Sequence, residues 1–285
     1  MTYVALILVL TAAVCHASWN FLAKRVQGGA ELVWLYSLAS SVIYLPLAVW
    51  IFASLPSGLD TMQWVFIGGS AVLHLVYFVM LQAAYRNGDL SLVYPTARSM
   101  GPLVAMILAI VFLAEFPSVQ GGIGALIIIG GVFALTGGGR GKSKKAGTSL
   151  LFGLGVGCLI GSYTTWDAYG VAALAVPPLL MDYGANVGRG VLLTPTAYRR
   201  RALVAEHWRN HRLEVIAIGV LTPLAYILVL TAMQTTPVAY VAPLREVSVL
   251  LTVLAGSILL GEGQLTHRLK WAAVILVGVV TLATS

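Results

Sequence analysis

Charged residues are scarce in this chain. Only 9% of its 285 residues are Asp, Glu, Lys or Arg, whereas soluble domains carry about 25%. Hydrophobic residues make up 59% of the chain, and its mean hydropathy is +0.91. A soluble fold of this length could not bury so many apolar side chains, because too much of it is surface. The composition therefore excludes a water-soluble domain and predicts a protein that lies in lipid.

Cysteines and metal-ligand patterns are also sparse. The two cysteines, Cys15 and Cys158, lie in apolar runs, so we interpret them as packing residues rather than a disulfide. No spacing in the sequence is typical of metal ligands, and we expect no cofactor. Residues 137–143 resemble a phosphate-binding loop, but Thr136 stands at the first required glycine and no soluble α/β unit surrounds the segment. ATP is therefore not expected as an energy source.

Ten apolar segments are close to the length of about 20 residues that a membrane-crossing helix needs. They are 3–23, 32–53, 63–85, 90–114, 120–137, 149–168, 178–197, 213–233, 238–261 and 268–284. No Lys or Arg precedes the first segment and a polar helix end follows it, so we interpret it as a membrane helix and not as a signal peptide. The predicted fold class is an all-α integral membrane protein with ten transmembrane helices.

The basic residues are distributed unevenly between the links. Fourteen of the 17 Lys and Arg residues fall in every second link, which places them on one face of the membrane. These links contain residues 24–25, 86, 140–145, 199–212 and 268–270. The positive-inside rule then predicts cytoplasmic basic links, both termini outside, and a location in a bacterial-type inner membrane. Topology thus explains the net charge of +7, and nucleic-acid binding is not expected.

The chain matches itself at an offset of 147 residues. The matched positions are Trp19-Asn20 with Trp166-Asp167, Arg98 with Arg245, Glu115 with Glu262, and Tyr36 with Tyr183. We therefore divide the chain into a first repeat (1–137), a basic linker (138–148) and a second repeat (149–285). Because each repeat has an odd number of predicted helices, five, the second is predicted to lie inverted relative to the first. Inverted repeats are typical of secondary transporters, which bind substrate near the bilayer midplane.

Short motifs in both repeats resemble one known family. They are Ala17-Ser18-Trp19-Asn20 followed by Lys24, Leu113-Ala114-Glu115, and Leu260-Gly261-Glu262. With these motifs the chain resembles the drug/metabolite transporter superfamily, in its ten-helix form built from two EamA-type repeats. The resemblance implies transport of small metabolites, often export of amino acids. Many ten-helix relatives are thought to keep both termini in the cytoplasm, and on this point we follow the charge distribution of the chain instead.

Arg98 and Arg245 lie inside predicted helices, where a charge costs about 2.5–3.5 kcal/mol or more and needs a partner or a water-filled cavity. A guanidinium at this depth can bind a carboxylate or phosphate through two parallel hydrogen bonds. Alternatively, the charge is balanced by an internal salt bridge, with Arg245 pairing a carboxylate from another helix. Glu246 adjoins Arg245 but points about 100° away around the helix, so it cannot easily satisfy its neighbour.

The predicted helix 178–197 carries a polar stripe. Asp182, Asn186 and Arg189 follow one another at spacings of four and three residues, so they share one face. Asn186 could bridge Asp182 to Arg189. The stripe faces protein or water rather than lipid, and it either binds substrate or holds the helix in place.

The remaining candidates are single polar residues and aromatic pairs. Asp167 could bind an amino group or a proton. Alternatively, Trp19 and Trp166 could mark the membrane interface, with Asn20 and Asp167 as caps of helix ends. His16 could relay protons or act as a hydrogen-bonding strut. The others could line a cavity or simply pack. They are Trp19, Asn20, His74, Tyr77, Tyr94, Tyr163 and Tyr240. Glu115 and Glu262 end their helices, where we expect them to bind backbone groups of the following turn.

These features favour a secondary transporter, an exporter or facilitator of amino acids or related zwitterionic or anionic compounds, working by alternating access between the repeats. The alternative is multidrug or lipophilic-cation efflux by proton antiport, with Asp167, Glu246 and the aromatic residues as the site. An enzyme is less favoured, since no catalytic cluster stands out beyond His16, His74 and Asp167. The expected partners are a small-molecule substrate and the bilayer. Proton coupling and a monomeric state are compatible with the sequence.

Overall fold

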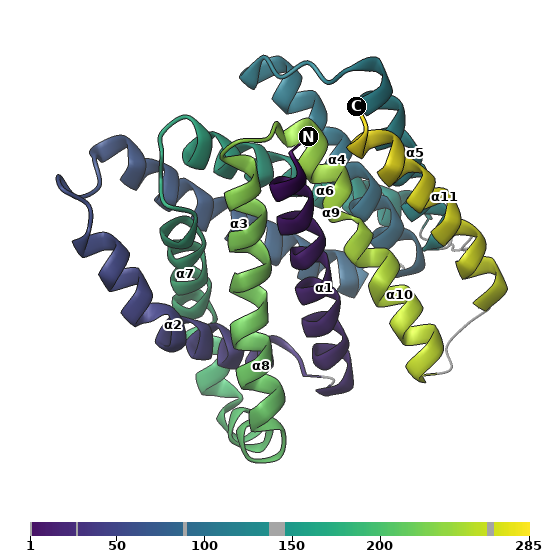
Figure 1. The fold of residues 1–285 in the computed structure, drawn as a ribbon. Coiled ribbons are helices and arrows are strands. Elements are labelled where there is room, and N and C mark those ends of the chain that lie inside the picture. The colour runs from purple at the N-terminus through teal and green to yellow at the C-terminus, as the bar shows by residue number, and fades with distance from the viewer. Residues whose placement is uncertain (1, 27, 88–89, 137–145, 261–264) are drawn as a thin grey trace.

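The computed structural model describes residues 2–26, 28–87, 90–136, 146–260 and 265–285. In these ranges the chain forms eleven helices and no strand (Figure 1). The helices are α1 (Tyr3–Val26), α2 (Ala30–Ala53), α3 (Thr61–Asn87), α4 (Leu90–Leu113), α5 (Val119–Leu135), α6 (Ala146–Ala172), α7 (Pro178–Arg199), α8 (Arg201–Met233), α9 (Val238–Arg245), α10 (Val247–Leu260) and α11 (Leu265–Ala283). Both termini lie at the same end of the bundle (Figure 1).

Eight helical segments of the described ranges are long and apolar enough to cross a membrane, and one of them joins α9 to the start of α10. Helix α5 is apolar but shorter, at 17 residues. Helix α7 does not reach this apolarity, because Asp182, Asn186 and Arg189 interrupt its sequence. The prediction of an all-helical membrane protein is therefore confirmed for the described ranges, whereas the count of ten crossings stays a prediction.

Helix α8 is longer than the sequence predicted. It begins at Arg201 rather than at residue 213, so the predicted link 198–212 is almost entirely helical. A kink at His211 (φ −135°, ψ 30°) separates the two parts. The first part is rich in Ala, Leu, Glu and Arg, which are good helix formers in water. Hydropathy detects only the part of a helix that is apolar enough for lipid, and it therefore missed this extension.

The predicted helix 238–261 is divided in two by Glu246. Pro243 has no backbone N–H and cannot complete the helical hydrogen-bond ladder. The N–H of Glu246 instead bonds to the carbonyl of Pro243 (3.0 Å), which makes a tighter turn between α9 and α10. Pro95, Pro102 and Pro223, which also mark possible kinks, lie inside continuous helices.

Glycines of α6 bring that helix close to α4. An added Cβ at Gly153, Gly157 or Gly161 would lie 2.7, 2.5 and 2.5 Å from the side chains of Thr96, Met100 and Val104, respectively. Both sets of residues recur every four positions, so the two helices present matching rows. Small residues at such spacing allow close helix packing in membranes. The close contact fixes α6, which carries Tyr163 and Asp167, against α4, which carries Arg98.

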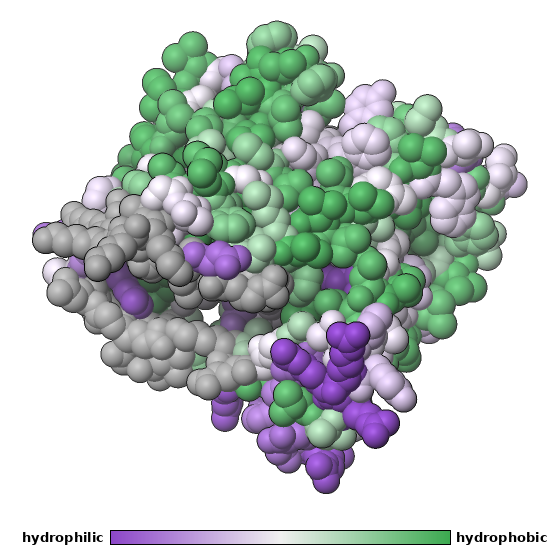
Figure 2. Space-filling view, turned by 180° about the vertical axis from the view of Figure 1, so that it is seen from behind, coloured by the Kyte–Doolittle hydropathy of each residue, from purple (hydrophilic) through white to green (hydrophobic). Residues whose placement is uncertain are grey.

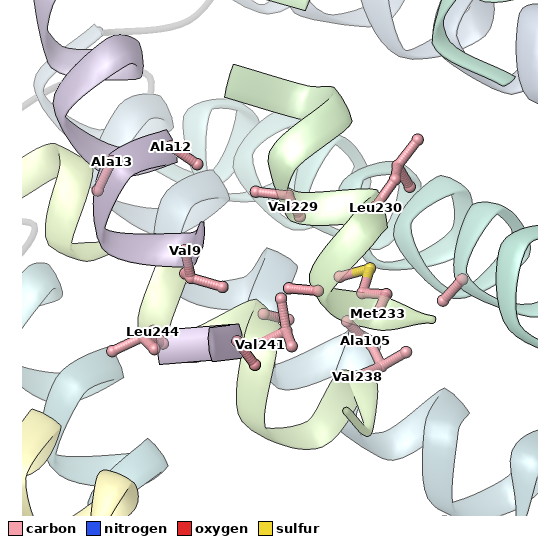
Figure 3. Close-up of a cluster of buried hydrophobic side chains, with 14 of the residues drawn as sticks. Val9, Ala12, Ala13, Ala105, Val229, Leu230, Met233, Val238, Val241 and Leu244 are labelled. Atoms are coloured by element: carbon pink, nitrogen blue, oxygen red, sulfur yellow. The ribbon is translucent and has the colours of Figure 1, made fainter. Parts of the chain in front are cut away.

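An apolar cluster fills the end of the bundle nearest the termini. It joins α1, α8 and α9 through fully buried residues such as Val9, Leu230 and Leu244 (Figure 3). At the opposite end of the molecule, where α8 begins, hydrophilic residues gather on the surface (Figure 2). The exposed arginines of this region are Arg199, Arg200, Arg201, Arg209 and Arg212.

Candidate functional site

A cavity of about 370 Å³ lies in the middle of the bundle and is lined by residues from α1 to α4 and from α6 to α10. Its lining residues on α1, His16, Trp19 and Asn20, come after the core residue Val9 along the helix, toward the basic end of the molecule. The apolar cluster borders the cavity on the side of the termini, because Ala12, Val229 and Val249 belong both to the cluster and to the cavity lining.

Arg98 lines the cavity and has a partner in the opposite repeat. Its guanidinium lies 3.0 Å from a carboxylate oxygen of Glu246, which is 1% exposed. The sequence analysis named Arg245 as the arginine of an internal salt bridge to another helix. In the described structure Arg98 forms such a bridge instead, because Glu246 points toward α4. An ion pair of this kind is costly to break, because either charge would then be buried alone.

Arg245 also lines the cavity, but its guanidinium makes no hydrogen bond or ion pair with any residue that the structure describes. The residue is 8% exposed. Its neighbour Glu246 points toward Arg98, as expected for consecutive residues of a helix. Within the described structure this buried charge therefore borders on the cavity and has no bonded partner.

The polar stripe of α7 is joined by hydrogen bonds. Asn186 donates from Nδ2 to Oδ2 of Asp182 (2.7 Å) and accepts at Oδ1 from Arg189. Arg189 also donates from Nε to the hydroxyl of Ser37 on α2 (3.1 Å) and lies over the ring of Tyr36. Asn186 thus bridges Asp182 and Arg189, as the spacing suggested. The charge of Arg189 is balanced inside the protein, and all three stripe residues line the cavity.

Asp167 lies behind the cavity wall and is completely buried. Its Oδ2 accepts a hydrogen bond from the hydroxyl of Tyr226 (2.6 Å) and lies 3.9 Å from Nε2 of His74. The ring of His74 packs against that of Tyr163, with centroids 4.1 Å apart and an angle of 31° between the ring planes. Tyr226, His74 and Tyr163 all line the cavity, so they separate the carboxyl group from it.

His16, Trp19 and Asn20 form one turn of α1 at the cavity. Trp19 donates from Nε1 to Nδ1 of His16 (3.3 Å), and Asn20 donates to the carbonyl of His16 (2.7 Å). Helix α1 continues to Val26 and α6 to Ala172, so neither Asn20 nor Asp167 caps a helix end. The interpretation of these residues as caps is therefore wrong, because both helices extend beyond the predicted boundaries.

Four of the candidate residues lie outside the cavity lining. Asp167 and Glu246 are buried behind it, as described above. Trp166 stacks on Phe66 (4.2 Å between centroids) and donates to its carbonyl, on the side of α6 that faces α3. The hydroxyl of Tyr240 accepts from the N–H of Ser118, near the end of the bundle that holds the termini. Helical spacing indicates a shared face but not the neighbour that covers it.

Twelve candidates line the cavity, and the structure adds others that the sequence analysis missed. Tyr77 and Tyr94 belong to the twelve. The added polar residues are Tyr36, Thr222, Tyr226, Ser248 and Thr252. Thr222 and Tyr226 are four residues apart, as are Ser248 and Thr252. A search for polar stripes like that of α7 would have found both pairs.

Glu115 holds the beginning of α9 in place. Its carboxylate accepts a hydrogen bond from the N–H of Val238 (2.7 Å), the first residue of α9. Burial raises the pKa of Glu115 above its ordinary value, and the N–H groups of Val238 and Ala239 offset part of that rise. We expected contacts with the turn that follows Glu115 itself, so the partner was wrong, because α9 belongs to the other repeat. Glu262 lies outside the described residues.

Comparison with known proteins agrees with a transport protein in a membrane. The EamA-like transporter family matches the chain twice, over residues 3–137 and 147–284. No curated protein matches the chain. A crystal structure described only as that of a protein has the same fold, with a TM-score of 0.73 and 15% identity over 100% of this chain and 98% of its own. The fold and cavity thus define a multi-pass membrane transporter. The chain belongs to the EamA-like transporter family, within the drug/metabolite transporter superfamily.

Proposed function

We propose that the cavity binds small organic metabolites with an acidic group, amino acids or related zwitterionic and anionic compounds, and that the protein carries them by alternating access. One observation supports this most directly. Arg245 is buried at the cavity wall without a partner among the described residues. Its planar guanidinium can hold a carboxylate or phosphonate through two parallel hydrogen bonds.

The charges around the cavity favour an anion at Arg245. Arg98 is balanced by Glu246, and Arg189 is balanced by Asp182 through Asn186. Arg245 then remains as the cation that a ligand can neutralise. A volume of about 370 Å³ suits a small metabolite, because ligand pockets typically span about 300–1,000 Å³.

The packing of the helices supports two inverted repeats. The predicted symmetry exchanges α1 with α6, α2 with α7, α3 with α8, α4 with the pair α9–α10, and α5 with α11. Helix α2 packs against its own counterpart α7, and α5 against α11. The pairs α1–α8 and α3–α6 are also exchanged by this symmetry, and both are in contact. Arg98 and Arg245 then belong to equivalent elements, and α9 ends at Arg245 as discontinuous transporter helices often end at a site.

The orientation follows from the charges. We place the basic end of the molecule in the cytoplasm of a bacterial-type inner membrane, with both termini outside. The apolar cluster then closes the cavity on the outer side, so this conformation faces inward. Rocking of the two repeats would open the outer side and close the inner one.

Efflux of lipophilic cations is the second candidate function, because Asp182 and several aromatic residues line the cavity. Of the carboxylates that such a site would need, Asp167 and Glu246 lie behind the wall. Among the residues that the structure describes, Asp182 is the one carboxylate of the cavity lining. It is itself bonded to Asn186, so the cation hypothesis has less support.

Thermal unfolding of the purified protein in detergent tests the proposal. A bound ligand raises the melting temperature, by the equivalent of about 2.7 kcal/mol at 100 times its Kd. The probes are L-glutamate, succinate, methylphosphonate and tetraphenylphosphonium. We expect stabilisation by one of the first three, its loss in Arg245→Gln, and its retention in the exposed control Arg209→Gln. Stabilisation by tetraphenylphosphonium alone would contradict the anion proposal and favour the cation function.

A further inference from the structure

The buried carboxyl group of Asp167 has few partners. Its Oδ2 accepts from Tyr226, and Oδ1 has no hydrogen-bond partner among the described residues. No Lys or Arg in those ranges forms an ion pair with it, and His74 lies 3.9 Å away. An ionised carboxylate in such surroundings costs several kcal/mol unless a nearby positive charge compensates it. The protonation of Asp167 therefore depends on the closest countercharge.

His74 gives the carboxyl group a path to the cavity. Its Nδ1 lies 2.9 Å from the carbonyl oxygen of Ser70, and a carbonyl only accepts, so Nδ1 carries a hydrogen. The other ring nitrogen, Nε2, faces Oδ2 of Asp167 and can accept or return a proton. The hydroxyl of Tyr226 contacts the same oxygen. Both side chains also line the cavity, so a proton can pass between Asp167 and the cavity through either.

Arg245 is the positive charge that can compensate an ionised Asp167. Several polar groups surround Asp167 on the helices packed against α6. They are Ser70 and His74 of α3, Tyr226 of α8, Asp182 of α7 and Arg245 of α9. Arg245 lines the same cavity as Tyr226 and His74, the two side chains that adjoin the Asp167 carboxyl group. Of the arginines that line this cavity, Arg98 and Arg189 are balanced by Glu246 and Asp182, and Arg245 has no paired acid in the described structure.

We propose that Asp167 is a proton-binding site linked to Arg245, so that a proton and the substrate anion bind together. This inference rests on the proposed binding of an acidic group at Arg245. In the empty cavity an ionised Asp167 compensates the charge of Arg245. When an anion neutralises Arg245, the carboxylate loses this compensation and takes up a proton through Tyr226 or His74. One negative and one positive charge enter together, so the buried site gains no net charge. The coupling is proton–anion symport, opposite in sense to proton antiport of a cation.

A ligand-free titration tests the linkage. Infrared difference spectra of the purified protein are recorded over a series of pH values, and they contain the C=O stretching bands of protonated carboxyl groups. The band of Asp167 is the one that disappears in Asp167→Asn. Arg245→Gln removes the countercharge as a bound anion would. We expect the band to persist to higher pH in Arg245→Gln, by about one pH unit. In the control Asp182→Asn, which removes another buried acid, the band that Asp167→Asn abolishes should still be present. Its midpoint is not compared, because Asp182 interacts electrostatically with Asp167. Identical midpoints in the wild type and Arg245→Gln would overturn the proposal.

A second variant covers the case in which Asp167→Asn does not fold. Tyr226→Phe keeps the ring and removes the hydrogen bond to Oδ2, so the frequency of an Asp167 band must change. If the frequency of the protonated-carboxyl band is the same in Tyr226→Phe as in the wild type, the band does not come from Asp167. This result would also overturn the proposal. The two hypotheses fail separately. If no probe stabilises the protein but the titration shifts in Arg245→Gln, the substrate class is wrong and the proton site stands. If probes bind and the titration does not shift, the linkage is wrong and the substrate class stands.

Discussion

Arg98 and Arg245 occupy positions 147 residues apart that match in sequence, yet their surroundings differ. Arg98 is paired with Glu246, whereas Arg245 borders the cavity without a partner in the described structure. The difference comes from one residue. Glu246 follows Arg245, while the residue that follows Arg98 is Ser99. Glu246 can neutralise only one of the two buried arginines, so the positive charge of Arg245 is not neutralised. We propose that the acidic group of the substrate binds to it.

The largest effect is expected when the ion pair between Arg98 and Glu246 is broken. Glu246→Ala leaves Arg98 buried without its carboxylate, which typically costs 3–5 kcal/mol. We expect a large fall in the melting temperature of the detergent-purified protein. The double variant Arg98→Met/Glu246→Met should recover most of the loss, because neither charge then remains buried. A double variant as unstable as Glu246→Ala would show that packing, not the ion pair, decides stability here.

The second prediction removes the free charge. Arg245→Gln should weaken binding of the stabilising anion about 100-fold, since truncating one side of a buried charge pair costs roughly 2–5 kcal/mol. Melting without ligand should hardly fall, because Arg245 loses no bond within the described structure. The measurement is the ligand concentration that gives half-maximal stabilisation. Unchanged affinity would remove Arg245 from the site.

A third variant would give Arg245 a carboxylate partner like the one that Arg98 has. Ser99 lies at the position that matches Glu246, and it is buried. If the repeats are related by symmetry, Ser99→Glu brings a carboxylate to Arg245 and competes with the substrate anion. We expect about tenfold weaker binding, an effect of roughly 1.4 kcal/mol. Ser99→Gln has the same shape without the charge, and equal losses in both variants would point to crowding instead.

The smallest expected effect concerns Glu115 at the start of α9, the helix that ends at Arg245. Its pKa is raised by burial, so the folded protein binds this proton more tightly than the unfolded chain does. Stability should therefore decline as pH rises from the ordinary value of 4.5 through the raised value. Melting temperatures between about pH 4 and 7 should show this decline in the wild type and a flatter profile in Glu115→Gln. Parallel profiles would exclude this contribution.

Much of the site could be anticipated from the sequence. Polar residues at helical spacing in an apolar chain must face protein or water, and Asp182, Asn186 and Arg189 do share one bonded stripe. The same logic misplaced Trp166 and Tyr240, whose covering neighbours Phe66 and Ser118 come from other helices. Spacing defines a face of one helix, and only the packing of several helices decides what that face meets.

The composition and periodicity of the sequence are enough to predict a helical chain in a membrane, with its basic residues in every second link between helices. The sequence also shows that the two halves of the chain match. These properties depend on composition and period, which each segment carries alone. Three contacts could be seen only once the helices were placed in space. Glu246 pairs with Arg98, Tyr226 donates a hydrogen bond to Asp167, and Arg245 faces the cavity. The partner of a buried charge lies on another helix, and the distance between helices follows from their packing rather than from the order of residues.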